Sequence, residues 1–176
     1  MNQPTIGIIA NPLSGRDVRR IAARGAVATN EDKRNRIARA VVGAVSTGVT
    51  RVVAMAEPFS IAAGALTDLR LGIDTEIIDV GHELNASSTT RAALAMRDLG
   101  VHVVVVLGGD GTNRIISMAW PDVVLAPMST GTNNVFPTPI EPTIVGTAAG
   151  LVAIDFATGG TNRNAWAPRA KVVRVT

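Results

Sequence analysis

Short apolar runs alternate along this chain with segments of helical periodicity. Five of the runs are rich in Val, Ile and Ala and are apolar at both odd and even positions, which is typical of strands buried on both faces of a parallel sheet. These runs cover residues 5–10, 51–55, 75–80, 101–107 and 123–126. The pattern therefore predicts five parallel strands.

Between the runs, apolar residues recur three and four positions apart, as on the buried face of a helix. The first such segment carries Ile37, Val41 and Ala44, and either Thr29 or Asn30 can cap it. Further helical segments follow at residues 58–72, 87–100 and 141–152. The alternation predicts right-handed β-α-β crossovers, and hence an α/β three-layer sandwich with a mostly parallel central sheet.

The end of the chain departs from this regular pattern. Gly146 and Gly150 weaken the last predicted helix, because glycine is a poor helix former. Residues 159–168 are typical of a linker, and the alternating sequence from Lys171 to Thr176 predicts one further strand. The α/β domain is therefore expected to end near residue 158.

Composition narrows the classes of protein that fit. The 176 residues include 47% hydrophobic but only 3% aromatic ones, so the core is built from aliphatic side chains. With no cysteine and two histidines, the chain has no disulfide, no thiolate metal site and no histidine metal cluster. No apolar stretch is long enough to cross a bilayer and no signal peptide precedes the first strand, so we expect a cytoplasmic protein without membrane insertion.

The pI of about 10.5 does not indicate a nucleic-acid-binding protein. The chain lacks Cys and Tyr, which titrate below Lys and Arg, so a net charge of only +3 raises the pI this far. Two Trp, three Phe and no Tyr leave few side chains on which bases could stack. We therefore expect no nucleic-acid partner.

The fourth apolar run ends in three glycines that surround one carboxylate, in the sequence GGDGTN (residues 108–113). Glycines at a strand end allow positive φ angles and let an anionic group approach main-chain amides, so this loop can hold a phosphate. Asp110 has several interpretations. It can orient a hydroxyl, take its proton or act through a cation such as Mg²⁺, or it can cap the helix that follows.

Two more strand ends carry a similar combination of glycine and small polar residues. The first run leads into NPLSG (residues 11–15), and the fifth leads into PMSTGTNN (residues 127–134). In an open parallel sheet, ligands bind in the crevice outside the carboxyl ends of the strands. The three loops are therefore expected to converge on one side of the molecule.

These three motifs, in this order and at this spacing, resemble those of the superfamily of NAD kinases and diacylglycerol or sphingosine kinases. The greatest likeness is to the ATP-NAD kinase-like proteins, a group that includes accessory proteins of acetoin catabolism. The resemblance extends from about Thr5 to the end of the chain, and GGDGT directly after a strand is its most specific part. It implies the fold of the NAD kinase/diacylglycerol kinase N-terminal domain.

The resemblance implies a role for each matching residue. Asp110 would be the catalytic or substrate-orienting carboxylate. The residues implied in the nucleotide phosphate site are Asn11, Ser14, Gly108, Gly109, Gly111, Thr112, Asn113, Gly131, Thr132 and Asn134. ATP and Mg²⁺ are the implied cofactors, NAD is the implied acceptor substrate, and no protein ligand to a metal is implied.

The implied reaction is phosphoryl transfer from ATP, or from polyphosphate, to a hydroxyl acceptor, and the 2′-hydroxyl of NAD is the best guess. A lipid or other small-alcohol kinase is an alternative, because NPLSG matches the lipid kinases. Against it, Asn133 replaces the second glycine of their GTGN sequence.

The superfamily's kinases also have a second, mostly β domain, whereas this chain ends at Thr176. We therefore expect a nucleotide-binding domain at residues 1–158, followed at 159–176 by a linker and the start of a missing or truncated second domain. Such a chain is expected to form a homo-oligomer and to be a poor kinase alone. A non-catalytic nucleotide-binding accessory or sensor protein is the second alternative.

Overall fold

A computed structural model of the chain describes residues 3–15, 28–81, 83, 85–130, 134–160 and 163–170. Five strands form one sheet in the order β3-β2-β1-β4-β5, and every neighbouring pair is parallel. The strands are β1 (Thr5–Ala10), β2 (Arg51–Met55), β3 (Asp74–Ile78), β4 (Val103–Gly108) and β5 (Leu125–Ser129). The prediction of five parallel strands is confirmed, with β5 lying two to three residues further along than expected.

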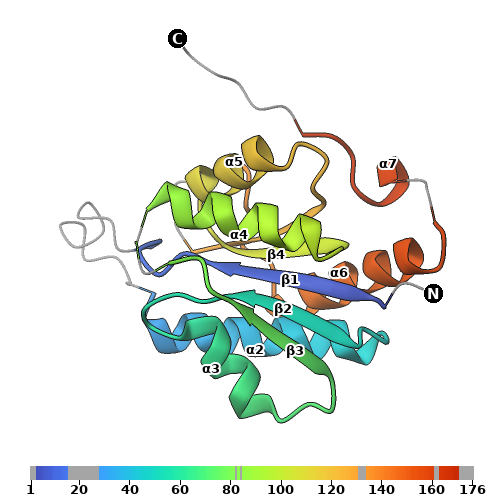
Figure 1. Cartoon of the computed structure of the whole chain (residues 1–176), viewed down its shortest axis with the longest axis horizontal. Helices are drawn as coiled ribbons and strands as arrows, with labels where there is room; N and C mark the ends of the chain where they lie inside the picture. Colours follow the sequence, from blue (N-terminus) through green and yellow to red (C-terminus); the bar gives the residue numbers. More distant parts are fainter. Residues whose placement is uncertain are drawn as a thin grey trace.

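Helices cover both faces of the sheet (Figure 1). They are α2 (Asn30–Ser46), α3 (Ile61–Leu69), α4 (Ala86–Asp98), α5 (Asp110–Ala119), α6 (Pro142–Ala157) and the short α7 (Arg163–Trp166). One hydrophobic cluster joins α2, α3 and α6 to the sheet, and a second joins α4 and α5 to its other face. The predicted three-layer α/β sandwich is therefore confirmed.

The C-terminal segment is described only in part. Helix α7 lies within residues 159–168, where the sequence predicted a linker. The terminal strand predicted for residues 171–176 lies outside the described residues.

The direction of strand order reverses between β1 and β4. β1 pairs with β2 on one side and with β4 on the other, so the chain crosses from the β3 edge to the far side of β1 before it adds β4 and β5. Such a reversal opens a crevice at the carboxyl ends of the two central strands. The fold thus predicts a ligand site at the carboxyl ends of β1 and β4.

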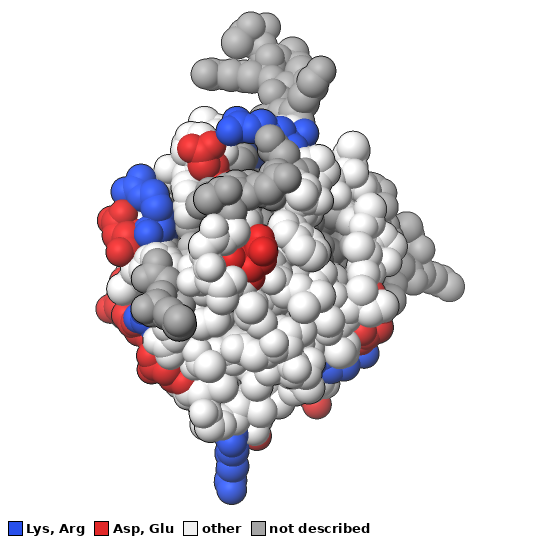
Figure 2. Space-filling view, turned by 90° about the vertical axis from the view of Figure 1, so that its right-hand side faces the viewer, with Lys and Arg blue, Asp and Glu red and all other residues white. Residues whose placement is uncertain are grey.

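The side of the molecule opposite the carboxyl ends of the strands has few charged side chains at its centre. Figure 2 shows the side that carries the N-terminus and α7, and its charged side chains lie mainly at the margin of a largely uncharged surface. No helix among the described residues combines the length and the apolar character needed to cross a membrane.

Helices α2 and α6 pack unusually closely, and their glycines explain why. A Cβ atom added at Gly146 would collide with the backbone oxygen of Ala40, and one added at Gly150 would lie 2.8 Å from the backbone oxygen of Ala44. A Cβ at Gly43 would likewise collide with the backbone oxygen of Thr143. The glycines that weaken the helical pattern of α6 are thus the residues that allow it to pack against α2.

We predict that Gly146→Ala lowers the free energy of unfolding by about 1–3 kcal/mol, because the two helix backbones must separate to admit a methyl group. In an open helix the same change would stabilise by about 1 kcal/mol. Gly64→Ala in α3 is the matched control, because the added Cβ would meet only the guanidinium of Arg34, which can move. Urea denaturation of both variants measures the difference, and an equal effect would contradict backbone contact as the cause.

Candidate functional site

A cleft of about 380 Å³ lies at the carboxyl ends of β1 and β4. Its walls come from the loop after β1, the end of β2, the first turns of α4 and α5, and the loop after β5. The sequence-predicted residues that line it are Asn11, Ser14, Gly109, Gly111, Thr112 and Asn134. The expected convergence of three loops is therefore found, at the position where the strand order reverses.

Asn11 ties the first loop to the second. Its backbone N–H donates to the oxygen of Leu107 at 2.9 Å, which extends the β1–β4 ladder by one residue. Its side-chain amide donates to Thr112 Oγ1 at 3.0 Å, and its Oδ1 accepts from the N–H of Leu13 at 2.9 Å. Asn11 therefore shapes the cleft through three backbone and side-chain bonds.

The first loop is also held from below. Ser14 Oγ donates to the backbone oxygen of Asn11 at 2.7 Å. The fully buried Lys33 of α2 donates from Nζ to the backbone oxygens of Asn11 and Pro12, at 3.3 Å and 2.5 Å. Gly15 has φ +76°, and a Cβ there would lie 2.5 Å from the backbone oxygen of Thr130, so no other residue fits.

Lys33 was missed by the sequence analysis. It stands in a run of charged residues at the start of a helix, where a lysine is normally solvated. Its sequence signal is its spacing: Lys33 lies four residues before Ile37 and therefore on the same, buried face of the helix.

The glycines of the second loop do not have positive φ angles, so that expectation is wrong. Gly109 is extended, with φ −103° and ψ −171°, and it holds the N-cap position of α5. A Cβ at Gly108 would lie 2.8 Å from Thr112 Cβ, and one at Gly109 would lie 2.9 Å from Asn134 Oδ1. Close packing against the surrounding side chains, rather than backbone conformation, favours glycine at these two positions, more strongly at Gly108 than at Gly109, where the end of the Asn134 side chain could move.

Gly111 differs from its neighbours, because a Cβ added there would meet nothing within 4 Å. It lies in the first turn of α5 and lines the cleft. Its N-cap residue is a glycine, and no side chain among the described residues caps this helix. The start of α5 therefore presents unhindered backbone to the cleft.

Asp110 does not line the cleft. Its carboxylate accepts from the backbone N–H of Val135, with a shortest distance of 2.9 Å, and from that of Phe136 at 2.9 Å. The alternative in which Asp110 caps α5 is wrong, because Gly109 occupies the cap position and Asp110 is the first helical residue. The carboxylate instead joins the loop after β4 to the loop after β5.

The remaining predicted residues have mainly supporting contacts. Asn113 is buried behind the loop, where its side-chain amide donates to the backbone oxygen of Gly109 at 2.9 Å. Asn134 reaches across the cleft wall and donates to Ser129 Oγ at 2.9 Å. Gly131 and Thr132 lie outside the described residues.

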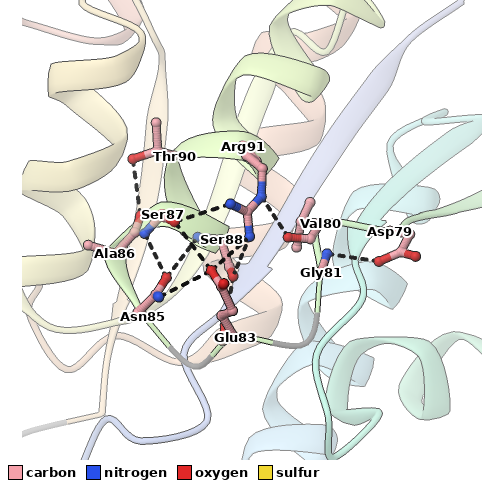
Figure 3. Close-up of polar contacts among 10 residues, drawn as sticks. All are labelled: Asp79, Val80, Gly81, Glu83, Asn85, Ala86, Ser87, Ser88, Thr90 and Arg91. Atoms are coloured by element: carbon pink, nitrogen blue, oxygen red, sulfur yellow. Dashed lines mark hydrogen bonds and ion pairs between the residues drawn. The ribbon is translucent and has the colours of Figure 1, made fainter.

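A second wall of the cleft was not foreseen. It contains Glu83 and Asn85, from the segment that leads from β3 into α4 (Figure 3), and Thr89 of α4 itself. Hydrogen bonds from Asn85 and then from Arg91 hold the pKa of the Glu83 carboxyl below its usual range. The sequence does carry a signal for this wall, since polar residues follow the predicted third strand, as they follow the first, fourth and fifth strands.

The cleft contains no evident metal centre of protein ligands. Among the residues that the structure describes, no group of three His, Cys, Asp or Glu side chains could hold an ion. Mg²⁺ needs no such cluster, because it is commonly held by ligand phosphates, water and one or two carboxylates.

Comparison with known proteins finds one named relative. Acetoin catabolism protein X of Cupriavidus necator is 39% identical over 157 residues, which cover 85% of this chain. The aligned part is 44% of that protein, so the chain spans less than half the length of the curated relative it matches. This similarity is compatible with the resemblance to ATP-NAD kinase-like proteins, whose group includes accessory proteins of acetoin catabolism.

Two further comparisons found nothing. No protein-family model matches the chain, and no solved structure matches it. The kinase family itself therefore stays a prediction from the three motifs.

We predict that Lys33→Met lowers the free energy of unfolding by about 1–3 kcal/mol, because two loop carbonyls lose a buried donor. Arg34→Met is the control, since Arg34, the next residue in sequence, lies over Gly64 and forms an exposed ion pair with Asp68 at 3.7 Å, without a bond to the first loop among the described residues. Exposed pairs of this kind contribute about 0–1 kcal/mol. Chemical denaturation measures both changes, and a Lys33→Met variant as stable as the control would show that the ammonium does not hold the loop.

Proposed function

We propose that the cleft binds a nucleotide through its phosphates, and that the chain is the nucleotide-binding part of an ATP-NAD kinase-like protein. The observation that carries this proposal is the open start of α5, which is uncapped and reaches the cleft beside Gly111. The first amides of a helix have no partner within the helix, and its dipole places partial positive charge there. An anion such as phosphate supplies both a hydrogen-bond acceptor for these amides and a negative charge that complements the dipole.

The neighbouring side chains suit the same ligand. Thr112 Oγ1 accepts from Asn11, so its own hydroxyl proton is available to a phosphate oxygen. Thr112 and Asn11 both line the cleft. The buried ammonium of Lys33 lies directly below the first loop and adds positive potential under the phosphates.

We further propose that the reaction is phosphoryl transfer from ATP, or polyphosphate, to a hydroxyl acceptor, with the 2′-hydroxyl of NAD as the first candidate. Catalysis of this kind rests on positioning and charge neutralisation, to which Mg²⁺ bound to the phosphates would contribute. Asp110 would orient the acceptor hydroxyl or receive its proton. In that role its carboxylate would share its remaining lone pairs with the hydroxyl, or release the amides of Val135 and Phe136, to which it is now bonded.

A non-catalytic role is the second candidate, and the contacts of Asp110 favour it. A carboxylate that is bonded to two backbone amides and does not line the cleft serves as a structural link. The name of the relative, acetoin catabolism protein X, supports an accessory role in acetoin catabolism for this chain as well. In that case the cleft would sense a nucleotide without turning it over.

We predict that Gly111→Ala weakens binding of ATP and of tripolyphosphate at least tenfold, because the methyl group occupies the space through which phosphate approaches. The same variant should be more stable by about 0.5 kcal/mol, since alanine is the better helix former and meets no clash. Calorimetric titration and thermal unfolding measure the two quantities.

Gly72→Ala is the matched control, because the added methyl also meets nothing but lies beside the amino end of β3, away from the cleft. Its affinity for ATP should equal that of the unaltered chain. Opposite signs for stability and affinity in Gly111→Ala are the specific signature of a phosphate site. Unaltered affinity in this variant would refute the proposed site.

Asp110→Asn distinguishes the two candidate functions. The amide keeps one acceptor for the loop, so nucleotide affinity should stay within a few-fold, whereas phosphoryl transfer should fall by about 10² to 10⁴, the usual contribution of a positioned acid–base group. The assay is transfer from ATP to NAD, with a panel of lipid and small alcohols as other acceptors. If the unaltered chain binds ATP but transfers nothing to any acceptor, the accessory role is correct.

A further inference from the structure

Two helices, α4 and α5, begin at the same cleft, and they differ in how their first backbone amides are capped. The start of α5 has no side-chain cap. The start of α4 is capped by Asn85, whose Oδ1 accepts from the N–H groups of Ser87 at 2.9 Å and Ser88 at 3.3 Å. Two of the first amides of α4 are therefore already used, so this end of the cleft offers an anion fewer free amides than a helix start without a side-chain cap.

A carboxylate stands in front of the capped helix. Glu83 Oε2 accepts from Asn85 Nδ2 at 3.2 Å, from Arg91 Nη2 at 3.3 Å and from Ser87 Oγ at 3.5 Å (Figure 3). Arg91 is fixed in turn, because its Nε donates to the backbone oxygen of Val80 at 2.8 Å. One oxygen of Glu83 is thus anchored by three donors.

The other oxygen of Glu83 is uncommitted. Oε1 accepts no hydrogen bond from any residue that the structure describes, and Glu83 lines the cleft. An ionised carboxylate only accepts hydrogen bonds, so at the cleft the partly exposed Glu83 can accept from a ligand donor, and its charge disfavours a phosphate. The cleft is therefore polarised, with an anion site at α5 and a donor-selecting site at α4.

From this polarity we infer that Glu83 Oε1 accepts a hydrogen bond from a ribose hydroxyl of the nucleotide whose phosphates lie at the start of α5. The inference rests on the proposed function, because it takes the phosphates at α5 as given. A ribonucleotide has this combination, with an anionic end and an uncharged end that carries hydroxyl donors. The same residue excludes nucleotides that bear a phosphate on the ribose hydroxyl.

The polar contacts of Glu83 also set the pH range of this selection. Because bonds from Asn85 and Arg91 hold the pKa of Glu83 below its usual range, the carboxylate stays ionised at neutral and mildly acidic pH. The preference for a free hydroxyl is therefore fully present above the ordinary glutamate range. It is lost only as the pH falls through the lowered pKa.

Glu83→Gln replaces the hydrogen-bond acceptor Oε1 with a donor. The three donors around Oε2 require the amide oxygen of the glutamine to take that place, which turns the NH₂ group toward the cleft. The cleft would then present a donor where it had presented an acceptor. Glu83→Ala removes the contact without introducing a donor.

The test is calorimetric titration of ADP, 2′-deoxy-ADP, 3′-deoxy-ADP and tripolyphosphate, in the presence of Mg²⁺. The unaltered chain should bind ADP about tenfold or more tightly than the analogue that lacks the recognised hydroxyl, as for a bond to a charged group. Both Glu83 variants should lose this preference. Their affinity for tripolyphosphate should not fall, because one negative charge leaves the cleft.

Asp98→Asn is the matched control, because it removes an exposed carboxylate from the opposite end of α4, the helix that Glu83 precedes. It should keep the preference for ADP. If the unaltered chain binds ADP and both deoxy analogues equally, or if the Glu83 variants keep the preference, the inference is wrong while the phosphate site stands. If the unaltered chain binds neither ADP nor tripolyphosphate, the proposed function fails and the inference fails with it.

Discussion

The parallel pairing of β1 with β4 is the constraint on which the rest of the structure depends. The register runs from Ile6 opposite Val103 to Ala10 opposite Leu107, and the N–H of Asn11 continues it by one bond. Both loops therefore leave the sheet at the same level. The side-chain bond from Asn11 to Thr112 then joins them, so that a single ladder of hydrogen bonds fixes the floor of the cleft.

This floor organises charge along the cleft. The buried ammonium of Lys33 lies below the first loop, the start of α5 reaches the cleft at Gly111, and Glu83 lines another wall of the cleft. Each group is held by backbone or side-chain partners before any ligand arrives. Groups that are already oriented need no reorganisation on binding, which is the physical advantage of building a site on strand ends.

The sequence predicts the architecture well because hydrophobic periodicity and the rule for strand ends need no knowledge of distant contacts. Local patterns cannot show which side chains meet. The burial of Lys33 depends on carbonyls 21 and 22 residues away, and the amides that bind Asp110 lie 25 and 26 residues away. The role of Gly146 was not predicted for the same reason, because it depends on close contact with the backbone of α2 at Ala40.

The bonds of Asp110 connect stability with function. Hydrogen bonds to a charged group are stronger than those between neutral groups, and two of them join the loops after β4 and β5, although their exposure to water reduces what they contribute. An acceptor hydroxyl can take over the carboxylate only if ligand contacts replace that free energy. In the proposed binding mode, phosphates at the start of α5 would do so, because their charge would compete with the carboxylate for the same positive end of the helix. Nucleotide binding and loop opening would then be one coupled step, whereas an accessory protein that only binds a nucleotide gains most by leaving the link closed.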